Sequence, residues 1–207
     1  EELAGGAFDV NWFSEAYEKL GEKNFKMLYD AAKYSSSGTA HARARKYADA
    51  ALGRVKAEDL KAEIDKKRNK DLLMSLGLLP LSEAHGEREA QILDRYQFIQ
   101  KFKKESRSFG AQRRASEGRA VDLALRNLSV AAGFSDVTRL TLRMESRLTE
   151  TANAYFDWKP LGDIEISLSV DEAGKSSLLC RKDGRALKSV PAKYKKDERF
   201  LEYQGMN

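Results

Sequence analysis

Residues 116–149 read SEGRAVDLALRNLSVAAGFSDVTRLTLRMESRLT, and their pattern predicts two helices joined by a tight turn. Apolar side chains recur at three- and four-residue spacing on both sides of Gly133, as on the buried face of a helix. Gly133 itself stands where a helix-ending glycine is favoured, and Ser135 or Asp136 can cap the second helix. The same spacing, broken at Gly, Ser or Pro, predicts a helical domain of six to eight helices over residues 1–160.

After Pro160 the period of the apolar side chains changes from about 3.6 to about 2, which is typical of β-strands. DIEISLSV at 163–170 alternates strictly, and Asp183-Gly184 is a strong signal for a hairpin turn. We therefore expect a three-stranded antiparallel β-meander over residues 161–191. Because so small a sheet is marginal alone, the meander is expected to pack on the helical domain. The fold class is mainly α (α+β).

The last residues, 192–207, read as a basic C-terminal tail at a truncated boundary. No apolar run reaches the roughly 20 residues that cross a bilayer, and the N-terminus is acidic, unlike a signal peptide. These features predict a cytoplasmic protein without membrane contact. Cys180 is the single cysteine, which excludes an internal disulfide and indicates a small buried strand residue.

Two basic segments stand on an otherwise acidic chain. Residues 101–119 carry seven Lys and Arg against two Glu, and residues 181–199 carry eight against three, so each sums to +5. The whole chain is also +5, so the remainder sums to −5. Such asymmetry is typical of a polyanion-binding surface or of solvated helix faces. The candidate polyanion-binding residues are Lys101, Lys103, Lys104, Arg107, Arg113, Arg114 and Arg119.

Residues 128–144, LSVAAGFSDVTRLTLRM, resemble the second half of a DNA-reading helix-turn-helix of the arabinose-regulator type. The resemblance implies that the second helix enters the major groove. Its candidate base-reading residues are Thr138, Arg139, Thr141 and Arg143. Two short helices that meet at a glycine give the same pattern, and Glu145 on this helix would repel an anionic ligand.

Phe98, Phe102 and Phe109 interleave with the basic residues of 101–119 and permit two interpretations. Aromatic side chains beside lysines can stack on single-stranded bases. At helical spacing they more often fill a core, which is the interpretation favoured here.

Signatures of catalysis, metal binding and cofactor binding are absent from the sequence. Gly174-Lys175-Ser176 resembles the end of a phosphate-binding loop, but Ser169 stands where the motif requires glycine. His41 and His85 have no Cys, Asp or His at ligand spacing. We expect no cofactor and no metal, and the sequence favours a non-catalytic protein over an enzyme.

Several strings together resemble a region of very large bacterial proteins of unknown function, related to the molybdate metabolism regulator and often accompanied by a WGR domain. They are RARKYADAALG (43–53), IDKKRNKDLLMSLGLLPL (64–81), DRYQFIQKFKKESRSFGAQRRASEGRAVDLALRNL (94–128), AGFSDVTRLTLRME (132–145) and DGRALKSVPAKYKKD (183–197). The resemblance implies a fragment or short relative of a longer polypeptide, and it brings no active-site residues with it.

Three functions follow as hypotheses. The first is a non-catalytic interaction or scaffold segment that engages other segments of a larger polypeptide or a protein partner. The second is a nucleic-acid-binding module that uses residues 101–119, with or without the helix-turn-helix-like region 116–149. The third is an enzyme with an unrecognised cleft.

Overall fold

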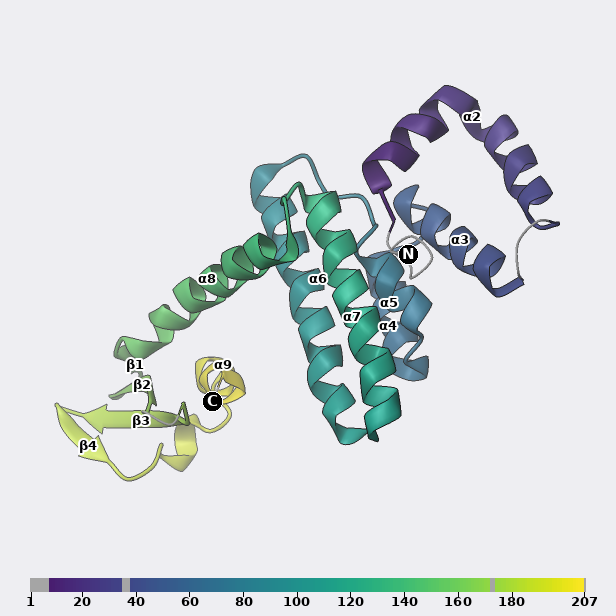
Figure 1. Cartoon of the computed structure of the whole chain (residues 1–207). Helices are drawn as coiled ribbons and strands as arrows, with labels where there is room; N and C mark the ends of the chain where they lie inside the picture. The colour runs from purple at the N-terminus through teal and green to yellow at the C-terminus, as the bar shows by residue number, and fades with distance from the viewer. Residues whose placement is uncertain (1–7, 35–37, 172–173, 207) are drawn as a thin grey trace. The chain divides into compact units, whose positions relative to one another are not determined.

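The computed structural model describes residues 8–34, 38–171 and 174–206. In this part of the chain, seven α-helices are followed by a four-stranded antiparallel sheet, and an eighth α-helix follows the sheet (Figure 1). The mainly α (α+β) class is confirmed. The chain divides into two compact units, residues 1–142 and 143–207, and the division falls inside α8 (Val137–Phe156). The predicted domain boundary at 160/161 stays a prediction.

The first unit is a set of helices whose ends carry the expected capping signals. Asp9 accepts a hydrogen bond from the Trp12 N–H, and Asn69 accepts one from the Leu72 N–H. Gly21, with φ of 71°, breaks the first helix into two arms, as the sequence indicated. The elements are α2 (Val10–Ala32), α3 (Gly38–Ala51), α4 (Ala57–Lys67), α5 (Lys70–Leu76), α6 (His85–Glu105), the short 3-10 helix η1 (Ser106–Ser108), α7 (Ala111–Ala132) and the start of α8.

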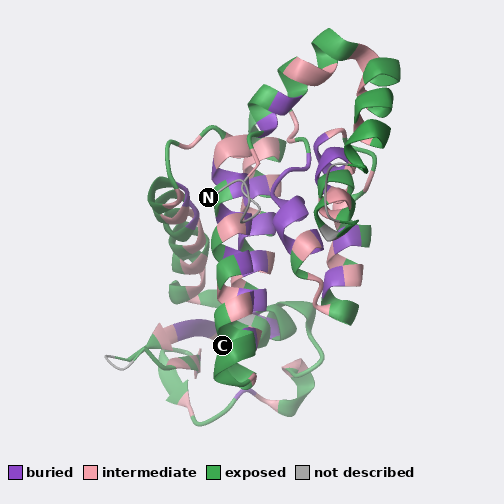
Figure 2. Cartoon of the chain, turned by 45° about the vertical axis from the view of Figure 1, so that its right-hand side comes forward, coloured by how far each residue is buried: buried purple, intermediate pink, exposed green. Residues whose placement is uncertain are grey.

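The core of this unit is built around the short helix α5. Its residues 72–76 are all buried, and it packs against α3, α4 and α7. Ile64, Ile99 and Leu128 are fully buried on the neighbouring helices. Figure 2 shows buried residues gathered on the inward sides of these helices, whereas the second arm of α2 is almost entirely exposed.

Buried polar groups hold the connections of this core in place. Arg95, 4% exposed, donates to the carbonyl oxygens of Leu79 (2.6 Å) and Pro80 (2.9 Å), so it fixes the segment between α5 and α6. Asn127, 1% exposed, donates to the Met74 carbonyl and accepts from the Phe8 N–H. Satisfied groups of this kind specify one arrangement of the helices.

Gly77 directly follows α5 and lies against the backbone of α7. A Cβ atom there would lie 2.7 Å from both the Ala124 carbonyl oxygen and the Leu128 nitrogen, which are backbone atoms that cannot turn aside. We expect Gly77→Ala to lower the free energy of unfolding in urea by roughly 1–3 kcal/mol, as overpacked cores do. Gly118→Ala on α7 is the control, since a Cβ there meets nothing within 4 Å. A Gly77→Ala protein as stable as wild type would contradict this packing.

The second unit contains four strands rather than the three predicted. They are β1 (Lys159–Leu161), β2 (Ile164–Val170), β3 (Ser176–Lys182) and β4 (Arg185–Leu187), paired antiparallel in the order β1-β2-β3-β4. The strand that the sequence pattern did not predict is β1, which contains Pro160. Proline is tolerated on an edge strand, where its missing N–H costs no ladder hydrogen bond, and β1 is an edge strand.

The apolar face of the sheet is covered within its own unit. Ile166 and Cys180 are buried, which confirms the prediction for Cys180. Where a basic tail was expected over 192–207, the chain forms the 3-10 helix η2 (Ala192–Tyr194) and the helix α9 (Glu198–Met206). Phe200 and Tyr203 of α9 belong to the same buried cluster as the strand residues. The predicted packing of the sheet on residues 1–160 stays a prediction.

Candidate functional site

The seven predicted polyanion-binding residues lie on the last turns of α6, on η1 and on the first half of α7. We call this segment, residues 101–119, the α6–α7 corner. All seven side chains belong to exposed residues: Lys101, Lys103, Lys104, Arg107, Arg113, Arg114 and Arg119.

Two of the seven cations are used by the fold itself. Lys101 forms ion pairs with Asp65 (3.1 Å) and Glu105 (3.8 Å). Arg113 pairs with Glu117 at 2.9 Å, and its guanidinium carbon lies 3.7 Å from the centre of the Phe109 ring. These two charges are partly neutralised before any ligand arrives.

The other five cations have no ion-pair partner within the part of the chain that the structure describes. They are Lys103, Lys104, Arg107, Arg114 and Arg119. Unpaired cations on exposed helix ends keep their full attraction for an anionic partner. The sequence identified the segment, but it could not separate these five from the two that the fold uses.

Beneath the corner lies a buried charge network centred on Arg68. Its guanidinium donates to the Glu117 carboxylate (2.8 and 3.2 Å), to Glu105 (2.7 Å) and to the Phe102 carbonyl (3.0 Å). Ser106 Oγ donates to Glu117 at 2.5 Å. The network therefore ties the end of α4 to η1, to the end of α6 and to the start of α7.

Glu117, only 2% exposed, is kept ionised by this network. Burial by itself raises the pKa of a carboxyl, but hydrogen bonds from Arg68, Ser106 and Arg113 outweigh it and lower the pKa of Glu117 to about 2. Glu117 does not suit the role of a general acid, because its carboxyl stays charged and hydrogen-bonded at neutral pH.

The three phenylalanines of this region pack against protein groups. Phe102 is 2% exposed, with the Arg68 guanidinium carbon 3.8 Å from its ring centre. Phe109 lies between Arg68 and Arg113, and Phe98 contacts the amines of two lysines. Their arrangement favours the core interpretation over a platform for stacked bases.

The helix-turn-helix-like region has the predicted succession of elements. Gly133 ends α7 in a left-handed conformation with φ of 83°, and the Phe134 N–H bonds to the Ser129 carbonyl. Asp136 then accepts from the Arg139 N–H at the start of α8. The turn residues thus act as the sequence indicated.

The four predicted base-reading residues do not share one face of α8. Thr138, Arg139 and Arg143 are exposed, but Thr141 is half-buried. Residues two positions apart are separated by about 200° around a helix, so Thr141 and Arg143 point in different directions. Arg139 also donates to Ser135 Oγ at 2.5 Å within the turn. The base-reading role of these four residues stays a prediction.

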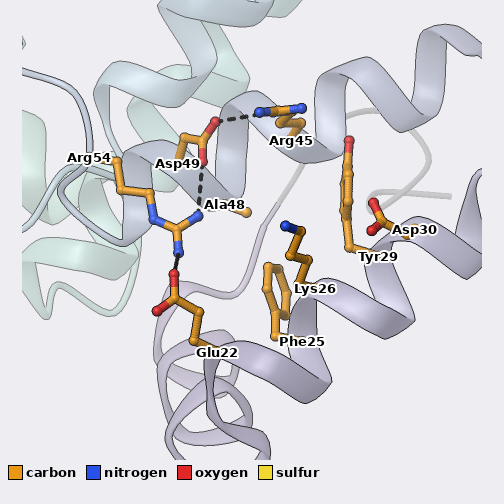
Figure 3. Close-up of a pocket in the computed structure, with 9 residues that line it drawn as sticks. All are labelled: Glu22, Phe25, Lys26, Tyr29, Asp30, Arg45, Ala48, Asp49 and Arg54. Atoms are coloured by element: carbon orange, nitrogen blue, oxygen red, sulfur yellow. Dashed lines mark hydrogen bonds and ion pairs between the residues drawn. The ribbon is translucent and has the colours of Figure 1, made fainter.

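A second candidate site, which sequence reasoning missed, is a pocket between the second arm of α2 and α3 (Figure 3). Its volume is about 270 Å³. The lining residues are Glu22, Phe25, Lys26, Tyr29, Asp30, Arg45, Ala48, Asp49 and Arg54. Phe25 and Tyr29 of α2 are half-buried, and Leu28 between them is 55% exposed. Only the fold could show that Phe25 and Tyr29 border an open space.

Within the described ranges, no group of His, Cys, Asp and Glu side chains is arranged to hold a metal ion. Among the same residues, no helix combines the length and the apolar character needed to span a membrane.

A helical unit followed by a small antiparallel sheet defines the class of protein: mainly α, within the α+β proteins. A family model matches residues 1–144, and the chain belongs to that family, which is described as a family of unknown function (DUF5724). Comparison with curated proteins and with solved structures finds no match to the chain.

Proposed function

We propose that the chain is a non-catalytic binding segment of a larger bacterial, regulator-like protein and that its α6–α7 corner contacts the phosphates of a nucleic acid. One observation carries the proposal: five exposed cations without ion-pair partners, among the described residues, lie on a corner held by the Arg68 network. Phosphate contacts from Lys and Arg supply most of the sequence-independent affinity for nucleic acids. The context of a larger regulator-like protein comes from the sequence resemblance.

The proposed contact is with the backbone rather than with base edges. Of the four predicted base-reading residues, Thr141 is half-buried and Arg139 donates to Ser135 Oγ, which favours phosphate contacts in this proposal. Phosphate contacts alone predict similar affinity for unrelated sequences.

The test is fluorescence anisotropy with labelled duplex and single-stranded DNA and RNA. Four phosphate contacts predict that affinity falls about 100-fold between about 50 and 200 mM salt. The test variant changes Lys103, Lys104, Arg107 and Arg114 to Gln. Arg113 is left unchanged because it belongs to the buried network.

A matched control removes the same charge elsewhere, by changing Arg185, Lys188, Lys195 and Lys196 to Gln. These four are also exposed and lack ion-pair partners among the described residues. The test variant is expected to lose the salt-dependent binding, and the control is expected to keep most of it. If both variants lost nucleic-acid affinity equally, the binding would depend on the net charge of the chain alone, and the assignment to the α6–α7 corner would be overturned.

A protein-interaction role is the second candidate, favoured by the apolar surface of α2 and the residues after it. Trp12, Met27, Leu28 and Tyr34 are 69%, 63%, 55% and 91% exposed. Exposed apolar side chains that gather on one element are typical of an interaction surface. Hydrogen exchange of α2 tests it: exchange should be slower in a longer polypeptide than in residues 1–207 alone.

A further inference from the structure

The pocket between α2 and α3 has a rigid frame of paired charges. Arg54 donates to Glu22 (3.1 Å), to Asp49 (3.3 Å) and to the Tyr17 hydroxyl (3.2 Å). Figure 3 shows the pairs of Arg54 with Glu22 and Asp49 on one side of the pocket. The frame links the start of the second arm of α2 to the end of α3, so these charges already have partners within the chain.

Two aromatic rings form the apolar part of the pocket. Tyr29 is fixed by stacking on His41, with ring centres 4.1 Å apart, and by its hydroxyl, which donates to the His41 carbonyl. Phe25 is held by edge contacts with Phe13 and Tyr17. Rings that are fixed before binding offer contact area at little entropic cost.

The remaining charges of the pocket are of both signs. Lys26 and Asp30, which lie on either side of Tyr29 in Figure 3, have no ion-pair partner among the described residues. Arg45, whose side chain is 71% exposed, has one pair, at 3.6 Å from Asp49. Donors from Lys26 and Arg45 suit a carboxylate, and Asp30 suits an ammonium group.

We propose that this pocket binds a small aromatic zwitterion, such as a free aromatic amino acid. Its aromatic ring packs on Phe25 and Tyr29, its carboxylate accepts from Lys26 and Arg45, and its ammonium group donates to Asp30. A volume of about 270 Å³ is slightly below the roughly 300–1,000 Å³ typical of ligand pockets, which suits a ligand of about the size of an amino acid. This site is separate from the α6–α7 corner and does not depend on the proposed function.

The experiment is a titration of residues 1–207 with phenylalanine, tryptophan, 3-phenylpropionate and phenethylamine, followed by amide chemical shifts in NMR. The amino acids should move amide signals of α2 and α3. The two analogues, each lacking one charge, should bind about tenfold more weakly, because each loses a charge-assisted hydrogen bond.

Single substitutions test which pocket residues bind the two charged groups of the ligand. Lys26→Gln and Asp30→Asn are each expected to weaken phenylalanine binding about tenfold, and Tyr29→Leu is expected to abolish it. Lys23→Gln is the matched control, since Lys23 is exposed on the same helix and does not line the pocket. Spectra of the free variants verify that each is folded.

Three results would overturn the proposal. The first is the absence of shifts in α2 and α3 up to about 10 mM ligand, a concentration that detects even weak complexes. The second is phenylalanine binding that neither Lys26→Gln nor Asp30→Asn weakens. The third is equal affinity for phenylalanine and 3-phenylpropionate, which leaves Asp30 without a role.

Discussion

Replacing Arg68 with methionine is expected to lower the free energy of unfolding by about 3–5 kcal/mol, the cost of breaking a buried ion pair by removing one partner. The side chain of Arg68 is 14% exposed and that of Glu117 is 3% exposed, so water cannot replace the lost hydrogen bonds. Urea unfolding at neutral pH, followed by circular dichroism, measures the loss.

Methionine is the suitable replacement because it retains most of the apolar volume over the Phe102 ring. The substitution also leaves the backbone strain at position 68 unchanged. The φ angle there is 49°, and methionine is as unfavourable as arginine in this left-handed conformation. The measured difference therefore reports the charge network.

Arg113→Met is the matched control. Arg113 also pairs with Glu117, but its side chain is 52% exposed, and exposed pairs contribute at most about 1 kcal/mol. If Arg68→Met cost no more than Arg113→Met, the network would not be what holds α4, α6 and α7 together.

Elements defined by local chemistry could be predicted from the sequence. Gly133 ends a helix because a left-handed residue is needed there, and glycine adopts that conformation without strain. The Asp183-Gly184 turn is also a local signal, and it appears in the structure. The alternation in β2 appears only in part, because Ser167 is 2% exposed and Val170 is 49% exposed. The helix end at Gly133 and the turn at Asp183-Gly184 are therefore explained by residues that are adjacent in the sequence.

Elements that depend on distant partners could not be predicted. Phe200 and Tyr203 of α9 are buried in one cluster with strand residues of the sheet, which the local sequence does not indicate. Arg68 bonds to Glu105 and Glu117, which are 37 and 49 residues away. Sequence spacing does not show which distant side chains will meet.

The candidate site shows the same division. The composition of residues 101–119 predicted exposed basic side chains, and the structure places all seven cations at exposed positions. That Lys101 and Arg113 are held by Asp65 and Glu117 is a consequence of tertiary packing. The pocket between α2 and α3 is likewise formed by two segments that the sequence gives no reason to pair.

The acid sensitivity of the first unit is expected to depend on Glu117. Its pKa is about 2 in the folded chain against an ordinary value of 4.5, so the folded state binds fewer protons than the unfolded state over this range. Stability from Glu117 is therefore complete above about pH 4.5 and is lost as the pH falls towards about 2. The difference corresponds to about 3 kcal/mol.

The measurement is the free energy of unfolding in urea from about pH 6 to about pH 2.5, for wild type and Glu117→Gln. Glutamine retains the shape and can still accept from Arg68, but it does not titrate. Other carboxyls with lowered pKa values, Asp163 among them, contribute equally to both proteins. The gap between the two curves should therefore narrow by about 3 kcal/mol as the pH falls. Parallel curves would show that Glu117 has an ordinary pKa and that the Arg68 network does not hold it ionised.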